Sequence, residues 1–387
     1  MEVLFVTLGI CVRVFGYVQG LRPSLRFLES PYTCLTNLQE GNYYIETGFF
    51  PYFEGSPVHS PPLVLGYFNA VSLSTFFFTI VCIELHSAWL IRTLTRSKTA
   101  FWLFYLNPFS VILTLNMSTS VLNIWSALIF VYFSEKGKKT PAALALAWVW
   151  YIDPSLGILS SVWYFKNRSF KIYFLSASWG FVLKLASDLI TGPGWVQNCQ
   201  FSSFFMYDIR PSFGLRWYLM LEMFNQYHLM YSVMIAVHTW VYIYPLISIL
   251  DKFHRYSKYE RINELYLSII FAIIYINHPH PTLFEYFLVV CFFLQHEPII
   301  LKVKSAFFTV SSWVIGNLLS VVMWNVWIYR MGGNVNFLYF QTIFTNCVAI
   351  GFIVALLYQI VEDTHKCKVK IMCKELLVEC VSKLVDS

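Results

Sequence analysis

Residues 305–328 read SAFFTVSSWVIGNLLSVVMWNVWI, and residues 336–359 read NFLYFQTIFTNCVAIGFIVALLYQ. Neither stretch contains a charged residue, and each can cross a bilayer, which takes roughly 20 mostly apolar residues in a helix. The rest of the 387-residue chain is similar, because 57% of its residues are hydrophobic and only 12% are charged. A soluble domain carries about 25% charged residues. The sequence therefore excludes a soluble enzyme, a disordered chain and a small disulfide scaffold, and it predicts an all-α polytopic membrane protein.

Apolar runs recur along the chain and predict about twelve transmembrane helices in a single integral membrane domain, residues 1–387. The runs at 141–152 and 155–165 are short and share the break Asp153-Pro154. The sequence leaves open whether they are two spans or one broken or re-entrant element, which is tolerated where it lines a cavity. The predicted spans are 2–20, 64–91, 99–115, 119–133, 141–152, 155–165, 172–190, 228–249, 263–277, 281–295, 305–328 and 336–359.

The basic residues test this layout, because cytosolic loops of membrane proteins are enriched in Lys and Arg. If the loops alternate from a cytosolic N-terminus, 20 of the 27 basic residues fall on the cytosolic side. We therefore expect both termini in the cytosol and the long loops 21–63 and 191–227 in the lumen. The cytosolic set is Arg92, Arg96, Lys98, Lys136, Lys138, Lys139, Lys166, Arg168, Lys171, Lys252, Arg255, Lys258, Arg261, Lys302, Lys304, Lys366, Lys368, Lys370, Lys374 and Lys383.

The C-terminal segment, residues 361–387, carries charges that the spans lack. Between residues 366 and 385 the apolar side chains fall on one helical stripe, flanked by Lys370, Lys374 and Lys383. We expect a cytosolic amphipathic tail that lies as an interfacial helix on anionic lipid. The alternative is a helix that docks on the bundle or on a partner protein.

Sequence motifs for catalysis and for metal binding are absent. The chain contains no P-loop, no H-E-x-x-H and no G-x-S-x-G, and its nine cysteines show no metal-ligand spacing. We therefore predict no catalytic residue, no metal site and no cofactor. The net charge of +6 is modest and does not indicate nucleic acid as a partner. Cys34 and Cys199, both in the predicted lumenal loops, are either two free thiols or one disulfide.

Charged residues within predicted spans are costly and therefore informative. Lys184 and Asp188 lie four residues apart on one helix face and are expected to form an internal ion pair. Glu84 and His86 lie two residues apart and face differently, so we expect Glu84 to be hydrogen-bonded between helices. The proline-rich residues 277–281 are expected to form a rigid lumenal turn. We therefore expect all of these residues to stabilise the fold and not to bind a ligand.

One aromatic block on the predicted lumenal side suits the binding of a lipid head group. Residues 213–224 read FGLRWYLMLEMF, an amphipathic helix whose charges are Arg216 and Glu222. This composition is typical of an interfacial helix, and Arg216 can contact an anionic head group. Packing of the helix on its own bundle explains the pattern equally well.

A second block, residues 324–339, reads WNVWIYRMGGNVNFLY and forms a glycine-broken hairpin between the last two spans. The amides of Asn334 and Asn336 can donate hydrogen bonds to phosphate or to sugar hydroxyls. The simpler alternative is that Asn336 caps the last helix.

Several motifs in a fixed order resemble a known family. They are Thr47-Gly48, Pro51-Tyr52, Gly55, Val58-His59 and Pro61-Pro62-Leu63; Leu106-Asn107-Pro108; Gly214-Leu215-x-Trp217-Tyr218 with Glu222-Met223-Phe224; and Trp324-x-x-Trp327-Ile328-Tyr329 with Asn334-x-Asn336-Phe337 and Tyr339. Together they run from residue 47 to residue 340. In this order and spacing they resemble the U-subunit family of the glycosylphosphatidylinositol (GPI) transamidase complex.

The resemblance implies a membrane scaffold of the GT-C glycosyltransferase type in the endoplasmic reticulum (ER). It implies a complex that replaces a protein's C-terminal signal with a GPI anchor, and in which a separate, cysteine-protease-like subunit is catalytic. The U subunit is non-catalytic and helps to hold the GPI lipid, and its paired asparagines, which resemble Asn334 and Asn336, contact GPI. The implied partners are the GPI lipid, the other transamidase subunits and ER membrane lipids.

The alternative is a GPI mannosyltransferase of the same architecture, which uses dolichol-phosphate-mannose. Those enzymes carry an Asp-x-Asp motif about a dozen residues before the glycine that matches Gly48. Residues 29–37 read ESPYTCLTN here and contain no Asp. Because a catalytic base must be present before its geometry matters, the sequence favours the non-catalytic subunit.

We therefore expect a lumenal site for the GPI lipid that uses both aromatic blocks. Such a site needs donors at the edge of the bilayer and an apolar wall beneath them. Asn334, Asn336 and Arg216 would supply the donors. The other expected site residues are Trp217, Tyr218, Glu222, Phe337 and Tyr339.

Overall fold

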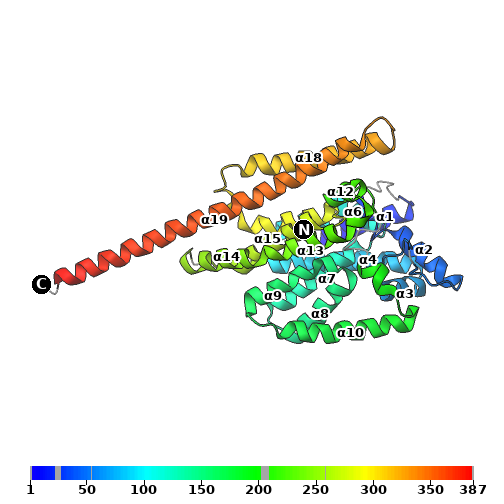
Figure 1. Ribbon diagram of the computed structural model, residues 1–387, viewed down its shortest axis with the longest axis horizontal. Coiled ribbons are helices and arrows are strands. Elements are labelled where there is room, and N and C mark those ends of the chain that lie inside the picture. The colour runs from blue at the N-terminus through cyan, green and yellow to red at the C-terminus, as the bar shows by residue number, and fades with distance from the viewer. Residues whose placement is uncertain (1, 22–27, 54, 202–208, 258, 386–387) are drawn as a thin grey trace.

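The computed structural model describes residues 2–21, 28–53, 55–201, 209–257 and 259–385. Within these ranges no strand occurs and every regular element is a helix, which confirms the all-α prediction. Most helices gather in one bundle, and the last two form a hairpin along one side of it (Figure 1). The helices are α1 (Glu2–Val18), α2 (Leu35–Glu46), α3 (Pro62–Ala70), α4 (Leu73–Thr95), α5 (Lys98–Tyr105), α6 (Pro108–Leu115), α7 (Ser120–Glu135), α8 (Lys139–Ile152), η2 (Pro154–Leu159), α9 (Ser160–Asn167), α10 (Lys171–Thr191), η3 (Gln197–Phe201), α12 (Arg216–Glu222), α13 (Asn225–Val241), α14 (Ile243–Ser257), α15 (Ile262–Asn277), α16 (Leu283–Phe293), η4 (Leu294–His296), α17 (Glu297–Ile300), α18 (Ala306–Ile328) and α19 (Val335–Val385).

Among the described residues, five helical segments are long and apolar enough to cross a membrane. They are α4, α13 with α14, α16 with the short helices that follow it, α18, and the Val335–Cys373 part of α19. A sixth results if α6 and α7, bent by 117° at their break, count as one broken span. Helices α1 and α15 are apolar but shorter. The chain is therefore polytopic, as predicted, whereas the predicted count of twelve spans is not confirmed.

A proline break explains why the predicted span 99–115 appears as two short helices. Helix α5 ends at Tyr105, and Pro108 occupies the first turn of α6. The Oδ1 of Asn107 accepts a hydrogen bond from the backbone N–H of Phe109 at 2.9 Å and so caps α6. Because proline excludes the residue before it from helical geometry, the apolar run cannot form one straight helix.

The stretch 141–165 is broken in the same way at Asp153-Pro154. Helix α8 ends just before Asp153, and the 3₁₀ helix η2 and helix α9 follow. Helices α8 and α9 contain 14 and 8 residues, so they measure about 21 Å and 12 Å. Neither length covers a hydrocarbon core of roughly 30 Å. The predicted break at Asp153-Pro154 is thus confirmed, and the two alternatives for the membrane course of this stretch stay predictions.

A buried ion pair ties the first helix to the bundle. The Arg13 Nη2 and Nε atoms lie 2.6 and 2.7 Å from the Glu84 carboxylate, and both side chains are fully buried. Ser110 on α6 donates to the same carboxylate. The predicted interhelical hydrogen bonding of Glu84 is thus confirmed, and Arg13 is a partner that the sequence did not reveal. His86 faces elsewhere and accepts from Trp125 Nε1 at 3.0 Å.

The predicted ion pair on α10 is also confirmed. Lys184 Nζ lies 2.6 Å from Asp188 Oδ2, and Trp195 Nε1 donates to the same carboxylate at 2.9 Å. The Lys184 side chain is about half exposed. This pair therefore lies on the side of the bundle and not in its core.

Helix α18 packs on α19 through a narrow strip. A Cβ at Gly316 would clash with the side chain of Thr345, so only glycine allows the two backbones to come this close. Gln341 Nε2 donates to the Gly316 carbonyl at 3.1 Å. The opposite side of α18 is apolar and uncovered, with Phe307 88% and Phe308 74% exposed. Such a side suits contact with lipid or with another membrane protein.

Helix α19 is continuous over 51 residues, and its C-terminal half extends far beyond the bundle (Figure 1). Among the described side chains of this part, Lys368 contacts the bundle, with its Nζ 5.9 Å from the centre of the Tyr256 ring. The predicted helical conformation of residues 366–385 is confirmed. Helix α19 contains no proline and runs without a break from the last span into the tail. The expected position of this tail on anionic lipid stays a prediction.

Candidate functional site

The two aromatic blocks meet where α12 lies against the start of α19. The Tyr218 hydroxyl donates to Asn336 Oδ1 at 2.5 Å, across 118 positions of the chain. The Tyr218 ring stacks on the Tyr339 ring, with centroids 4.2 Å apart and an interplanar angle of 28°. The Trp217 ring lies edge-on to Tyr339, with centroids 6.0 Å apart. The structure therefore brings four of the eight predicted site residues into one cluster, which we call the hairpin cluster: Trp217, Tyr218, Asn336 and Tyr339.

The turn between α18 and α19 fixes the position of both asparagines. Asn334 precedes the first residue of α19, and its Oδ1 accepts from the backbone N–H of Asn336 at 3.0 Å. Asn334, and not Asn336, is therefore the capping residue of the last helix, which corrects the alternative considered from the sequence. Asn336 lies within the first turn, and its side chain is directed to Tyr218.

Helix α12 is held between the proline-rich turn and α19. A Cβ at Gly214 would lie 2.9 Å from the Pro279 carbonyl oxygen, so a larger residue would push α12 away from this turn. On the other side, Asn346 Nδ2 donates to the Phe213 carbonyl at 3.0 Å. Asn346 is well within α19 and accepts from the Tyr286 hydroxyl at 3.2 Å. No sequence pattern points to Asn346, because nothing in a single asparagine indicates which distant segment its amide will bind.

Both asparagines of the turn keep donor capacity. Each Oδ1 accepts one hydrogen bond, whereas neither Nδ2 donates to any residue in the described part of the chain. Both side chains are exposed, and the adjacent Phe337 is 64% exposed. Amide donors therefore stand beside an uncovered aromatic ring, an arrangement that can bind phosphate or hydroxyl oxygens.

The two charged residues of α12 lie in different places. Glu222 is one turn beyond Tyr218, and partial desolvation together with this carboxylate raises the pKa of Tyr218. Glu222 thus belongs to the edge of the hairpin cluster. Arg216 lies on the opposite side of the helix, is only 7% exposed, and lines an internal cavity beside His278. The structure does not bring Arg216 to the asparagines.

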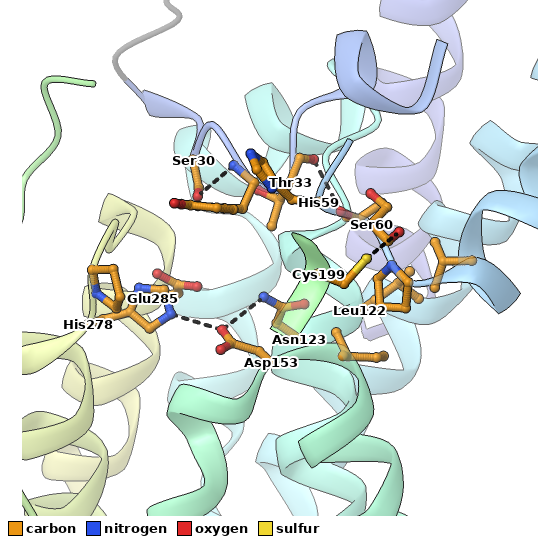
Figure 2. Close-up of a pocket in the computed structure, with 16 residues that line it drawn as sticks. Ser30, Thr33, His59, Ser60, Leu122, Asn123, Asp153, Cys199, His278 and Glu285 are labelled. Atoms are coloured by element: carbon orange, nitrogen blue, oxygen red, sulfur yellow. Dashed lines mark hydrogen bonds and ion pairs between the residues drawn. The ribbon is translucent and has the colours of Figure 1, made fainter. Parts of the chain in front are cut away.

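A polar cavity of about 30 Å³ lies beneath the two long loops (Figure 2). At its base His278 Nε2 lies 2.9 Å from Asp153 Oδ2, and Asn123 Nδ2 donates to the same oxygen at 3.4 Å. The Ser155 hydroxyl donates to the other carboxylate oxygen at 2.7 Å. Glu285 also lines the cavity and caps α16. The sequence predicted the turn that carries His278 but not its ion pair.

Electrostatics favour the charged forms of this pair. Burial alone would raise the pKa of Asp153, but the neighbouring His278 and the hydrogen bonds from Ser155 lower it. Burial would likewise lower the pKa of His278, but Asp153 raises it above its ordinary value. A cavity of this size admits about one or two water molecules. The pair therefore serves to hold α8, η2 and α15 together and leaves no room for a sugar-sized substrate.

The described parts of the predicted lumenal loops 21–63 and 191–227 contact each other beside this cavity. His59 Nδ1 lies 3.1 Å from the Asn198 carbonyl, and the Cys199 thiol donates to the Ser60 carbonyl at 3.3 Å. Cys34 and Cys199 are both buried thiols, and no disulfide joins these two residues. Of the two states that the sequence leaves open for these cysteines, the structure therefore has the thiols.

Comparison with known protein families matches residues 8–345 to the family described as GPI transamidase subunit PIG-U. The chain is 24% identical over 277 residues to the GPI-anchor transamidase component PIGU of Cricetulus griseus and to that of Homo sapiens, and each alignment covers 63% of this chain and 58% of the relative. It thus spans less than two thirds of these relatives. It is 25% identical over 345 residues to the GPI transamidase component GAB1 homolog of Schizosaccharomyces pombe, over 81% of each chain. Because the family match extends over most of its length, the chain belongs to the PIG-U family of GPI transamidase subunits.

Proposed function

We propose that this chain is a non-catalytic membrane subunit of a GPI transamidase complex in the ER. In this role it binds the GPI lipid and presents it for attachment to protein C-termini. Membership of the PIG-U family supports the assignment to the complex, and the apolar helices support a multi-pass location in the membrane. The chemistry on the protein substrate would belong to a separate, cysteine-protease-like subunit.

The observation that carries the lipid-binding role is the contact of Tyr218 with Asn336 and Tyr339. It unites two blocks, far apart in sequence, at one end of the last span. A GPI lipid brings phosphate, inositol and glycan hydroxyls to the edge of the bilayer, with acyl chains below. The outward Nδ2 groups of Asn334 and Asn336 suit the oxygen-rich head, and the exposed Phe337 ring suits the boundary with the chains. Arg216, which the sequence places among the donors, is buried beside the internal cavity and does not belong to this site.

The alternative function, a GPI mannosyltransferase, gains no support. Such an enzyme needs an available carboxylate beside room for a sugar phosphate. Asp153 is engaged by His278 at the base of a cavity of about 30 Å³, whereas small-molecule sites usually measure about 300–1,000 Å³. The family match assigns the chain to a transamidase subunit.

We also propose twelve membrane-crossing elements of GT-C type, some of them broken, with both termini in the cytosol. The supporting observation is that each predicted apolar run coincides with a helix or with a pair of helices. The bias of 20 basic residues to one side supports the orientation. In this arrangement the hairpin cluster and both long loops face the lumen.

The function is tested by removing the amide donors. We expect Asn336→Ala, and more strongly Asn334→Ala with Asn336→Ala, to leave the complex assembled but to slow anchor attachment. Losing a hydrogen bond to an anionic group costs about 1.5–3 kcal/mol, or roughly 10- to 150-fold in affinity. The measurement is GPI-anchored reporter at the cell surface of cells that depend on the variant, divided by the catalytic subunit that co-purifies with it.

Asn69→Ala is the matched control, because Asn69 is an exposed asparagine at the end of α3, on a different element. This variant should anchor the reporter as well as the unchanged chain does. Full activity of the asparagine double variant would exclude the turn as the lipid-head site. Loss of the co-purifying subunit in that variant would show that the asparagines serve assembly instead.

A further inference from the structure

Within the described part of the chain, Arg216 is a buried cation without a contacting anion. Its side chain is 7% exposed, and its Nε is enclosed without a hydrogen-bond partner. None of the described residues forms an ion pair or a hydrogen bond with this guanidinium. Burial lowers the pKa of Arg216 only to about 10, so the group stays protonated at neutral pH. An uncompensated buried charge of this kind is costly unless something pairs with it.

The acidic groups nearby are already engaged. Asp153 is paired with His278 and accepts two further hydrogen bonds from Ser155. The Glu285 carboxylate accepts from the Thr282 backbone N–H at 2.7 Å as part of the cap of α16. Arg216 is close enough to His278 to oppose its protonated form. Neither carboxylate contacts Arg216, so the guanidinium has no contacting anion among the described residues.

A cavity of about 30 Å³ lies beside the guanidinium. Four helical elements (η2, α12, α13 and α15) and the proline-rich turn line it, and its polar lining includes Ser155, Thr239 and Asn277. Asn277 Nδ2 donates one hydrogen to the Ile273 carbonyl and keeps a second that can reach a ligand. The volume admits about one or two water-sized particles, so a phosphate ester or a carboxylic acid of any length is too large.

We propose that this cavity is a binding site for a small inorganic anion of the size of chloride, held by Arg216. Water could fill the same space but would leave the guanidinium without a counter-charge. The bound anion joins α12 to η2, α13 and α15, the elements that line the cavity. Because Tyr218 projects from the other side of α12, the anion would also steady the helix that carries the hairpin cluster. The site does not depend on which head group binds at that cluster.

The test uses the full chain, fluorescently tagged and purified with its endogenous partners in mild detergent. Its melting temperature is followed by size exclusion while chloride is replaced by gluconate at constant ionic strength. Gluconate is too large for the cavity, whereas bromide should replace chloride. We expect the melting temperature to be roughly 2–4 °C higher in saturating chloride or bromide than in gluconate. Equal melting temperatures in all three salts would overturn the proposal.

Two variants test whether the chloride dependence of the melting temperature comes from Arg216. Arg216→Met removes the charge but keeps the length of the side chain, and it should remove the dependence on chloride. Arg330→Met removes an exposed arginine at the end of α18 and should preserve that dependence. A chloride effect that persists in Arg216→Met would overturn the site. If Arg216→Met does not fold, Arg216→Lys replaces it, and the site then requires a weaker dependence on chloride than in the unchanged chain.

Discussion

At the scale of single residues, the ion pair of Arg13 with Glu84 should matter most for stability. Arg13→Met would leave the Glu84 carboxylate buried and unpaired, which costs about 3–5 kcal/mol. Replacing both residues, as Arg13→Met with Glu84→Leu, should recover most of this loss. Lys184→Met is the contrast, because its pair with Asp188 is partly exposed and such pairs contribute about 0–1 kcal/mol. The melting temperature and cellular level of each variant test this ranking. Equal losses for Arg13→Met and Lys184→Met would contradict it.

The hydroxyl of Tyr218 allows a finer test of the hairpin cluster. Tyr218→Phe keeps the ring stacked on Tyr339 and removes only the hydrogen bond to Asn336. A hydrogen bond of this kind contributes about 0.5–1.5 kcal/mol, so anchor attachment should fall roughly 2- to 12-fold. Tyr218→Ala also removes the stacked ring and should lower attachment further, while both variants stay in the complex. If Tyr218→Phe is fully active and Asn336→Ala is not, the tyrosine does not position the asparagine.

At the scale of helices, apolar runs predicted the positions of the elements but not their lengths. Every predicted span contains helix, because hydrophobic runs of this length have no other stable form in a membrane. The lengths depend on single residues such as Pro108 and Pro154, which break runs that average hydropathy treats as continuous. The continuity of α19 could not be predicted either. A change from apolar to charged residues suggests the end of a span, but it does not end a helix.

The candidate site was predicted only in part for a related reason. Its predicted residues come from two sequence blocks, and a block does not show which side of its helix each residue occupies. Arg216 and Tyr218 differ by two positions, which on a helix places them on nearly opposite sides. The contacts of Asn346 and His278 join segments more than a hundred positions apart, and no local pattern reports such pairs.

The long helix α19 leads to a prediction about assembly. Its C-terminal part extends beyond the bundle (Figure 1), where other proteins can reach it. Removing residues 366–387 should leave the ion pair of Lys302 with Asp363 intact, at 2.6 Å. We expect this truncation to reduce co-purification of the other transamidase subunits more than it reduces GPI binding per assembled complex. Normal assembly together with lost GPI binding would contradict the prediction.

At the scale of the whole molecule, the two long loops, the turn at 277–281 and α12, which lie far apart in sequence, come together on one face. The described parts of the loops 21–63 and 191–227 contact each other, and α12 lies between the turn at 277–281 and the start of α19. The basic residues gather on the opposite side of the predicted membrane. The proposed orientation therefore puts the donors of the hairpin cluster and the polar cavity on the lumenal face.

This orientation can be read from N-glycosylation, which acts only on accessible lumenal Asn-x-Ser/Thr sites. Asn116-Met117-Ser118 is on the lumenal side in this layout, but we expect it to stay unmodified. Asn116 is 8% exposed and its amide donates to Glu29, while Ser118 is fully buried.

A short Gly/Ser linker with an Asn-Ser-Thr site, inserted after Gly48, should become modified, because Gly48 lies in an open turn where a Cβ would meet no heavy atom within 4 Å. Asn167-Arg168-Ser169 should stay unmodified on the cytosolic side. Gel shifts with and without glycosidase decide the matter: a bare linker would refute lumenal placement of the loop, and a glycan on Asn116 would refute its contact with Glu29.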